Sequence, residues 1–231
     1  MSAPARRQRS QRGSGEQLHA EIVAAAKRLL ADATSVDEVS IRAVADAVGV
    51  TPPSIYLHFS DKNELVAAVV ADVFAELDAA MLAEAGLAEG PLDRLRANGM
   101  AYVRFAVGHP EHYRIAMMDP CPTPGVDEVL ASSAFVHFQA TVQECMDAGI
   151  FAKGDPIPTT LDLWSAAHGI ASLLIAKPFM PWGDVDAVAD RVLCAAALGH
   201  AAAGLVGEPV TPARATSWLR RRGRRSQDSA R

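Results

Sequence analysis

The sequence predicts an all-α fold, in which three short N-terminal helices precede a longer helical domain. Apolar residues recur at helical spacing in one segment after another, and clusters of Gly, Pro and Asp separate these segments. No stretch alternates apolar and polar residues as a half-buried strand does. A chain of 231 residues has room for two such helical parts.

The composition predicts a folded globular chain. Half of the residues are hydrophobic and 21% are charged, which is far from the signature of a disordered protein. The three cysteines, Cys121, Cys145 and Cys194, are widely spaced and odd in number, which favours neither a disulfide framework nor a thiolate metal cluster. No stretch reaches the roughly 18 uncharged apolar residues of a membrane span, so we expect a cytoplasmic protein without membrane contact.

The first three helices are bounded by recognisable start and stop signals. Residues 16–31 carry one apolar face and are followed by a polar stretch. Ser40 is a good N-cap for a helix over residues 41–48, and Gly49 suits the left-handed residue that ends it. Thr51 then offers a cap and Pro52 the first position of a third helix. Two short helices joined by a Gly-containing turn indicate a helix-turn-helix.

Longer helices are expected in the remainder of the chain. Ser60 offers the N-cap of a fourth helix with Asp61 in its first turn, although Asn63 stands where a capping box would place Glu or Gln. One stripe of that helix contains Leu65, Val69, Val73, Leu77 and Met81. Five further helices are predicted over residues 92–107, 109–118, 127–148, 158–176 and 184–206.

The segment from Val39 to Leu65 resembles the DNA-binding domain of the TetR family of transcriptional regulators. The resemblance covers roughly residues 16–65 and depends on a combination of features: the capped helix from Ser40, the turn at Gly49, the Tyr-x-His-Phe sequence at 56–59, and Lys62 opening the next helix. It implies a sequence-specific transcriptional regulator that binds double-stranded DNA at a near-palindromic operator. Most regulators of this family are repressors, so repression is expected.

A short helix that begins with small residues can approach base edges in the major groove. We therefore expect base contacts, including apolar contacts to thymine methyl groups, from four residues: Thr51, Pro52, Pro53 and Ser54. Arg42 is expected either to read a base or to clamp a phosphate, and the sequence leaves both roles open.

The resemblance further implies phosphate contacts from Tyr56, His58 and Lys62. Tyr56 and His58 donate hydrogen bonds in that role, and the ammonium of Lys62 acts beside a helix N-terminus that favours anions. Alternatives remain for two of them: Tyr56 as a packed core aromatic, and His58 as a solvated surface residue.

A second resemblance lies at Trp164-Ser-Ala-Ala-His-Gly169, which is similar to a Trp-x-x-x-His-Gly signature of one C-terminal subgroup of the family. Trp164 and His168 are one helical turn apart, so they either form a satisfied core pair or share a cavity wall. A pocket for a small, apolar or aromatic effector is expected from aromatic, polar and flexible apolar residues: Tyr102, Phe105, His112, Tyr113, Met117, Phe138, Trp164 and His168.

A homodimer is expected through the helices at 158–176 and 184–206. The later helix carries small residues at spacings that permit close approach of a second helix: Ala195, Ala196, Gly199, Ala202 and Ala203. The family resemblance implies that the two helices of each protomer form a four-helix interface.

Other classes of function are disfavoured. His109-x-x-His112 has two metal ligands but no third, and no catalytic or nucleotide-binding motif occurs. We therefore expect no enzyme, no catalytic residues, no metal site and no cofactor. A ligand-independent regulator and a purely structural helical interaction protein remain as alternatives.

These observations divide the chain into four regions. We expect a flexible basic arm over residues 1–14, a helix-turn-helix domain over 15–62, a ligand-binding and dimerisation domain over 63–207, and a basic mobile tail over 208–231 with room for one short helix. The net charge is −5, yet arginines crowd both ends of the chain. No motif accounts for the tail or for the Pro-rich loop 119–125.

Overall fold

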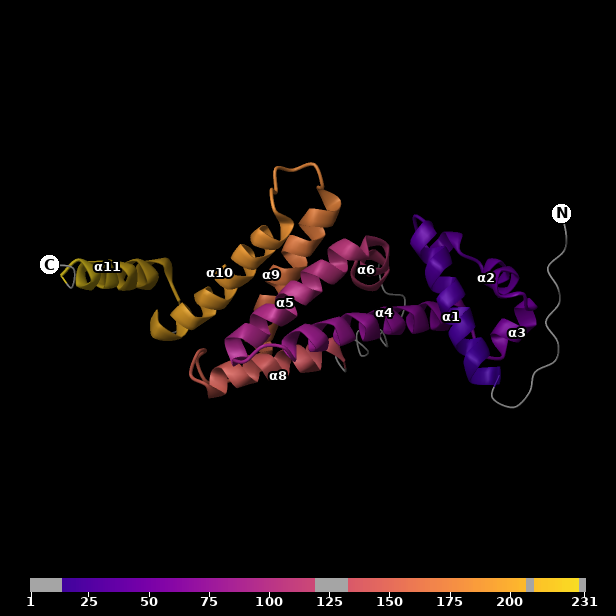
Figure 1. Ribbon diagram of the computed structural model, residues 1–231, viewed down its shortest axis with the longest axis horizontal. Helices are drawn as coiled ribbons and strands as arrows, with labels where there is room; N and C mark the ends of the chain where they lie inside the picture. The colour runs from indigo at the N-terminus through magenta and orange to yellow at the C-terminus, as the bar shows by residue number, and fades with distance from the viewer. Residues whose placement is uncertain (1–13, 119–132, 207–209, 229–231) are drawn as a thin grey trace. The chain divides into compact units, whose positions relative to one another are not determined.

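The computed structural model describes residues 14–118, 133–206 and 210–228, and the expected arm at 1–14 and loop 119–125 lie outside or almost wholly outside these ranges. The described residues form helices and no strand, which confirms the all-α prediction. In chain order the helices are α1 (Ser14–Asp32), η1 (Val36–Glu38), α2 (Ile41–Val48), α3 (Pro52–Tyr56), α4 (Lys62–Ala85), α5 (Pro91–Gly108), α6 (Pro110–Met117), α8 (Ala134–Asp147), α9 (Pro156–Ala176), α10 (Val185–Val206) and α11 (Pro212–Asp228), as Figure 1 shows.

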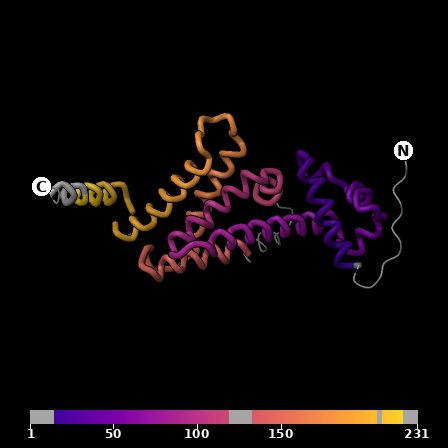
Figure 2. The backbone as a smooth tube through the Cα atoms, viewed as in Figure 1, coloured from indigo at the N-terminus to yellow at the C-terminus, as the bar shows by residue number. Residues whose placement is uncertain are grey.

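The chain divides into two compact units. Unit 1 contains residues 1–83 and 104–137, and unit 2 contains residues 84–103 and 138–231. Helices α4, α5 and α8 each begin in one unit and end in the other, so no simple linker separates the two. The backbone trace in Figure 2 shows how the chain leaves unit 1 and returns to it.

Unit 1 has a closed apolar core. Helix α1 packs against α2 and α6, and α3 packs against α2. Ile55 and Phe59 are buried and fix α3 and the residues after it to this core. The stripe predicted for α4 is also buried, since Leu65, Val69 and Val73 are all almost inaccessible to solvent.

Local signals set the ends of the short helices as predicted. The Ser40 hydroxyl accepts a hydrogen bond from the Ala43 amide at 3.1 Å and so caps α2. Gly49 ends α2 with a left-handed φ of 78°, where a Cβ would be strained. Pro52 opens α3 behind Thr51, whose side chain caps no helix amide and instead pairs with the Ser54 hydroxyl at 3.0 Å.

The expected N-cap of α4 at Ser60 is wrong. Helix α4 begins at Lys62, so Asp61 is its N-cap, and the Asp61 carboxylate accepts a hydrogen bond from the Glu64 amide at 2.9 Å. Glu64 in turn accepts from the Ser60 amide at 2.5 Å. The two capping contacts therefore lie one residue later than expected, with the acid at Glu64 in place of Asn63, and they differ from a capping box because Glu64 bonds the amide of Ser60 rather than that of Asp61.

Polar contacts connect α1 to α4 and α6 inside unit 1. The buried Lys27 ammonium lies 2.9 Å from Asp72 Oδ2 and 2.6 Å from Glu76 Oε2. Burial alone lowers the pKa of Lys27, but the hydrogen bonds to the two carboxylates outweigh it and leave the pKa raised. Arg114 of α6 donates to the carbonyls of Leu30 and Ala33, which lie in the last turn of α1 and just beyond it.

Unit 2 is built around the antiparallel pair α9 and α10, which run side by side in Figure 1 and are the most extensively packed pair of helices. Asp155 caps α9 by accepting from the Ile157 amide. Asn98 of α5 donates to Thr141 of α8 at 3.0 Å, and both side chains are buried. This buried hydrogen bond fixes the register of α5 against α8.

The C-terminal region is more helical than the sequence indicated. In place of a tail with one short helix, α11 spans 17 residues. Thr211 accepts a hydrogen bond from the Arg214 amide at 3.3 Å, and Pro212 occupies the first position of the helix. Ala and Arg are strong helix formers, so this stretch forms a helix although it has little to bury.

Candidate nucleic-acid interface and ligand cavity

The end of unit 1 that contains α3 presents a small polar surface. Arg42, Thr51, Pro53 and Tyr56 are exposed, whereas Pro52, Ser54, His58 and Lys62 are partly buried. Because Ile55 and Phe59 anchor the opposite side of this helix, the surface is held rigidly by the core behind it. All eight residues expected at the interface therefore retain some access to a partner.

Thr51 and Ser54 form the tip of α3. Their hydroxyls bond to each other and to no helix amide, so each keeps capacity for a further hydrogen bond. Hydroxyls of this kind can donate to or accept from base edges, and the adjacent Pro53 supplies an apolar contact. The geometry suits close approach to the floor of a groove, because no long side chain stands at this tip.

The exposure of Tyr56 argues against one of its two interpretations. The residue is 54% exposed and so is not a packed core aromatic. His58 is partly buried, and its ring meets the ring of His19 edge-on at 6.1 Å, so it is oriented by α1 rather than freely solvated. Both side chains lie where α3 ends, at which position a phenol or imidazole can reach a backbone phosphate.

Lys62 differs in detail from the expectation. The amides of Ser60 and Glu64 at the start of α4 are already bonded by the carboxylates of Glu64 and Asp61, so these two amides are not available to an anion. The Lys62 ammonium lies 3.9 Å from Asp37 Oδ1, a distance that permits only a weak ion pair at the surface. It is the ammonium, rather than these amides, that can hold a phosphate here.

Leu57 belongs to the same surface and was missed by the sequence analysis. It is 85% exposed between Tyr56 and His58. Its position directly after the last residue of α3 turns it away from the core, which a helical pattern read over the whole segment could not show. An exposed leucine beside the recognition helix is suited to contact a thymine methyl group or a sugar.

The eight residues expected to line a pocket are divided between the two units. Phe105, His112, Tyr113 and Met117 lie in unit 1, and Tyr102, Phe138, Trp164 and His168 lie in unit 2. In unit 1 Tyr113 is fully buried, and His112 stacks on His109 with ring centroids 5.8 Å apart. Within the described residues the buried Nδ1 of His112 has no hydrogen-bond partner, and burial lowers its pKa.

Three of the expected pocket residues in unit 2 form a hydrogen-bonded network. Trp164 Nε1 donates to Tyr102 Oη at 3.2 Å, and Tyr102 Oη lies 3.3 Å from His168 Nδ1. His168 Nε2 is 3.3 Å from the Ser172 hydroxyl, and burial lowers the pKa of His168. The signature Trp and His thus connect α9 to α5 through polar groups that satisfy one another, as in a packed core pair.

A cavity of about 230 Å³ lies elsewhere in unit 2, between α5, α8, α9 and α10. Of the expected pocket residues, only Phe138 lines it. The remaining lining is mostly apolar and small: Leu92, Asp93, Leu95, Arg96, Gly99, Ile150, Leu163, Ala167, Leu193, Cys194, Ala196, Ala197, Leu198 and Ala201. A sequence pattern could not find it, because alanines of α10 mark a cavity only when the partner helices are known.

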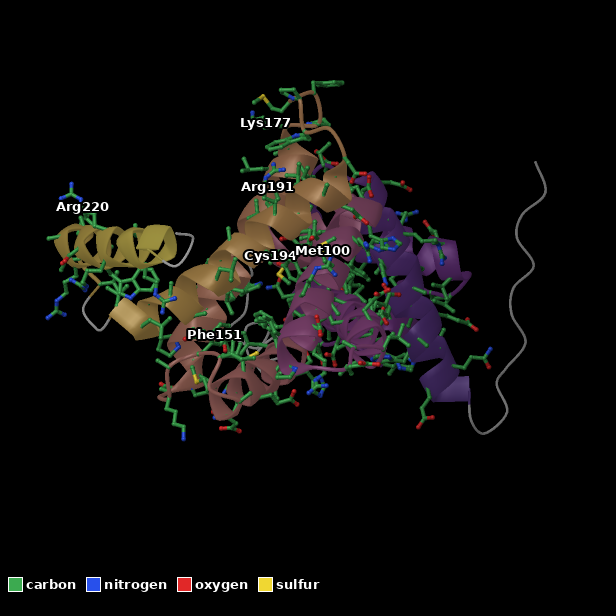
Figure 3. All side chains as sticks on the ribbon, turned by 60° about the vertical axis from the view of Figure 1, so that its left-hand side comes forward. Met100, Phe151, Lys177, Arg191, Cys194 and Arg220 are labelled. Atoms are coloured by element: carbon green, nitrogen blue, oxygen red, sulfur yellow. The ribbon has the colours of Figure 1, made fainter. Side chains whose placement is uncertain are left out.

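Two of the polar side chains in this cavity wall, Arg96 and Cys194, are paired with Asp190. Arg96 of α5 donates to Asp190 of α10 at 2.5 Å, and this bond lowers the pKa of Asp190. Cys194, which projects from α10 (Figure 3), donates to the same carboxylate, and burial raises the pKa of its thiol. Apart from Asp93, which is exposed to solvent, the cavity offers mostly apolar walls and a thiol of raised pKa, and it suits an uncharged, apolar ligand.

Helices α9 and α10 each leave apolar side chains exposed. Leu161 and Leu173 are exposed on α9, and Leu198 and Leu205 on α10. One helix among the described residues, Val185–Val206, is long and apolar enough to cross a membrane by length and composition, and only 11% of its most apolar window is buried. We call these four exposed leucines of α9 and α10 the exposed stripe. Exposed apolar side chains of this kind are commonly covered by a second protein surface.

Comparison with known families supports the sequence resemblance. A family model described as bacterial regulatory proteins of the tetR family matches residues 22–69, and one described as a tetracyclin repressor-like C-terminal domain matches residues 95–198. The first match contains α2, α3 and the start of α4, and the second contains most of the cavity lining and most of the α9–α10 pair. Among curated proteins, none matches this chain in sequence.

Solved structures share the fold. A protein of unknown function from Rhodococcus sp. RHA1 is 27% identical, with a TM-score of 0.70 over 84% of this chain and 100% of that one. The fatty acid degradation regulator FadR from Bacillus halodurans is 14% identical, with a TM-score of 0.67 over 82% and 96% of the two chains. RolR in complex with the ligand resorcinol is 18% identical, with a TM-score of 0.61 over 83% and 96%.

Proposed function

The chain belongs to the TetR family of DNA-binding transcriptional regulators, and from that premise we propose that it is a homodimeric repressor that leaves its operator when a small apolar molecule binds in unit 2. In this proposal residues 15–62 form the DNA-binding domain and residues 63–207 the regulatory domain. The observation that carries it is the rigidly anchored, exposed polar tip of α3 beside Tyr56.

On DNA, the two kinds of contact divide between two groups of residues. Thr51, Ser54 and the two prolines between them face the base edges, and Leu57 adds an apolar contact. Tyr56, His58 and Lys62 bind phosphates and fix the register, with Arg42 available for either role. The 3.9 Å separation of Lys62 from Asp37 supports this, since so weak a pair exchanges readily for a phosphate.

Dimerisation uses the exposed stripe of α9 and α10. Covering Leu161, Leu173, Leu198 and Leu205 with the same residues of a second copy removes four large apolar side chains of each protomer from water. A two-fold interface of this kind pairs the helices as a four-helix bundle. The dimer would hold two copies of α3 about 34 Å apart, the distance between successive major grooves on one face of DNA.

The effector is an uncharged apolar molecule of one or two rings, or a short aliphatic chain. A 150 Å³ apolar cavity holds benzene and drug-sized ligands need about 300 Å³ or more, so about 230 Å³ lies between these cases. Helix α10 supplies one wall of the cavity and two of the four leucines of the exposed stripe, so an effector that moves α10 also alters the dimer interface. A 100-fold loss of operator affinity needs about 2.7 kcal/mol of coupling.

The DNA-binding part is tested by titrating the protein against labelled DNA that flanks its own gene, at several salt concentrations. Tyr56→Phe removes only the phenol hydroxyl and Lys62→Gln only a charge, and we expect each to weaken operator binding several-fold. Lys153→Gln is the matched control, because Lys153 is exposed in unit 2 and far along the chain from α3. Operator affinity equal to the parent in both interface variants would contradict the proposal.

The effector part is tested by filling the cavity. Ala167 is buried in its wall, so Ala167→Leu occupies space that a guest needs. We expect the variant to bind operator as the parent does but to ignore small aromatic compounds that release the parent. A parent whose operator affinity no such compound changes would favour a ligand-independent regulator, the second candidate function.

A cytoplasmic, non-enzymatic role completes the proposal. The apolar character of α10 is accounted for by a dimer interface, so the proposal requires no membrane contact. Among the described residues, no group of three or more His, Cys, Asp or Glu side chains gathers around the pair His109 and His112.

A further inference from the structure

Helix α11 carries a charge opposite to that of the rest of the chain. It contains six arginines and one acidic residue, Asp228, whereas the whole chain has a net charge of −5. Neither family model reaches this helix, since the second match ends at residue 198. The function proposed above does not use it.

Three arginines of α11, Arg220, Arg221 and Arg222, are available to a partner. Arg220, Arg221 and Arg222 are exposed, and within the described residues none of them forms an ion pair with a carboxylate. Arg220 points away from the helix into solvent in Figure 3. Three adjacent cations that pair with no carboxylate of the described side chains repel one another, so a polyanion that neutralises them is bound favourably.

Two short-range contacts orient these guanidinium groups. Arg221 Nη1 donates to the Ser217 hydroxyl at 2.6 Å, and the Arg222 guanidinium lies 4.9 Å from the centre of the Trp218 ring. Each contact is made one turn earlier on the same helix and leaves further N–H donors unused. Arg220 and Arg221 also line a shallow groove along α11 with Thr216 and Ser217, two hydroxyl donors suited to phosphate oxygens.

The apolar residues of α11 do not fit a membrane surface. On the face opposite Arg221, Leu219 is the one large apolar side chain in the described part of the helix, beside Ala215 and Thr216. Trp218 is engaged by Arg222 rather than standing on that face. A helix that lies in a bilayer interface needs a broad face of Trp, Phe or Leu, so phosphate groups in water fit α11 better.

We propose that α11 is a second DNA-binding element, which contacts phosphates of duplex DNA through Arg220, Arg221 and Arg222 without reading sequence. Arginine rather than lysine at all three positions fits this role, because a planar guanidinium can donate two parallel hydrogen bonds to one phosphate. The element raises affinity for any DNA, and the tip of α3 then selects the operator. The inference does not depend on the effector or on repression.

The test measures binding of the full-length protein to a duplex without operator sequence as salt concentration is varied. Arg220→Gln/Arg221→Gln removes two charges and keeps good helix formers, and Lys153→Gln/Lys177→Gln removes two exposed charges of unit 2 as a matched control. Removing one arginine that neutralises a phosphate flattens the slope of log K against log salt by about 0.9. We expect a flattening of up to about 1.8 per protomer for the arginine variant and none for the control.

Further measurements keep the outcomes distinct. Arg220→Lys/Arg221→Lys retains the charges and should retain the slope, and a circular dichroism spectrum like that of the parent shows that each variant is folded. A slope unchanged in the Gln variant overturns the proposal. If binding to phosphatidylserine vesicles falls in that variant while the DNA slope is unchanged, α11 binds membranes instead. Operator discrimination is measured in Thr51→Ala alongside: its loss there with an unchanged α11 salt slope shows that base reading by α3 and phosphate binding by α11 are separate, so failure of one is distinguishable from failure of the other.

Discussion

The two units differ in how completely they bury their large apolar side chains. In unit 1 most large apolar residues of α1 to α4 pack against one another, and Tyr56, Leu57 and Leu82 are the exposed exceptions on these helices and the residue after α3. In unit 2 the pair α9 and α10 leaves Leu173 and Leu198 in water. A closed core needs no partner to be stable, whereas an open apolar stripe does. Unit 1 therefore has a core closed on itself, and we expect a second copy of the chain to cover the exposed leucines of unit 2.

The largest expected effect tests the closed core of unit 1. Phe59→Ala removes the aromatic side chain that anchors the end of α3, and a buried Phe→Ala change costs about 3–5 kcal/mol. We expect urea unfolding, followed by circular dichroism, to show that loss, with operator binding abolished. Dimerisation should persist, since Phe59 lies in unit 1.

Leu57→Ala is the control for this change. Leu57 is exposed two residues earlier, so truncating it should alter stability by no more than about 0.5 kcal/mol. A loss of stability as large as that of Phe59→Ala would mean that Leu57 is packed in solution and that the end of α3 is not exposed there.

The next effect tests the open stripe of unit 2. Leu198 is 65% exposed on α10, so Leu198→Glu should leave the protomer folded while placing like charges near each other across the two-fold axis. We expect the dimer dissociation constant to rise at least about 100-fold, which is roughly 2.7 kcal/mol, in analytical ultracentrifugation.

Leu87→Glu is the control, which makes the same chemical change at a leucine that is more exposed still. Leu87 is 84% exposed in unit 2 but lies between α4 and α5, outside the stripe. The dimer should survive this change. Equal dissociation by both variants would show that added charge, rather than the stripe, weakens the dimer.

The same contrast explains what the sequence could predict. Ser40, Gly49 and Pro52 act on their own neighbours, so the bounds of α2 and the start of α3 were predicted to the residue. At α4 two candidate caps stand side by side, and only the coordinates distinguish Asp61 from Ser60. The cavity was missed because its lining comes from four helices, and the position of a cavity depends on tertiary packing, which residue spacing does not encode.

A smaller effect is expected from the two hydroxyl side chains of the helix-turn-helix, and comparing them separates helix capping from base recognition. The Ser40 side chain caps α2, whereas Thr51 stands at the start of α3 without capping it. Ser40→Ala should lower the unfolding free energy by about 1 kcal/mol, and Thr51→Ala by clearly less. Operator discrimination, measured as the ratio of operator to random-duplex affinity, should fall in Thr51→Ala and stay unchanged in Ser40→Ala. The reverse pattern would assign Thr51 to structure and not to base recognition.

The smallest expected effect concerns His168 in the polar network of unit 2. Burial lowers the pKa of His168, so the unfolded chain binds its proton more tightly than the folded chain does. The stabilisation is therefore fully present above about pH 6.5 and is lost as the pH falls from there through the folded-state pKa. Protonation also changes the hydrogen bonds of the ring nitrogens with Tyr102 and Ser172.

His168→Gln removes this titration, and the difference in melting temperature between parent and variant should shrink as the pH is lowered from about 7.5 to about 5.5, across the ordinary histidine pKa. His112 in unit 1 also has a lowered pKa and contributes to the pH dependence of both proteins, so only the difference between them reports His168. A difference that stays constant over this range would mean that His168 does not titrate with unfolding, and that the network holds α5 to α9 by packing alone.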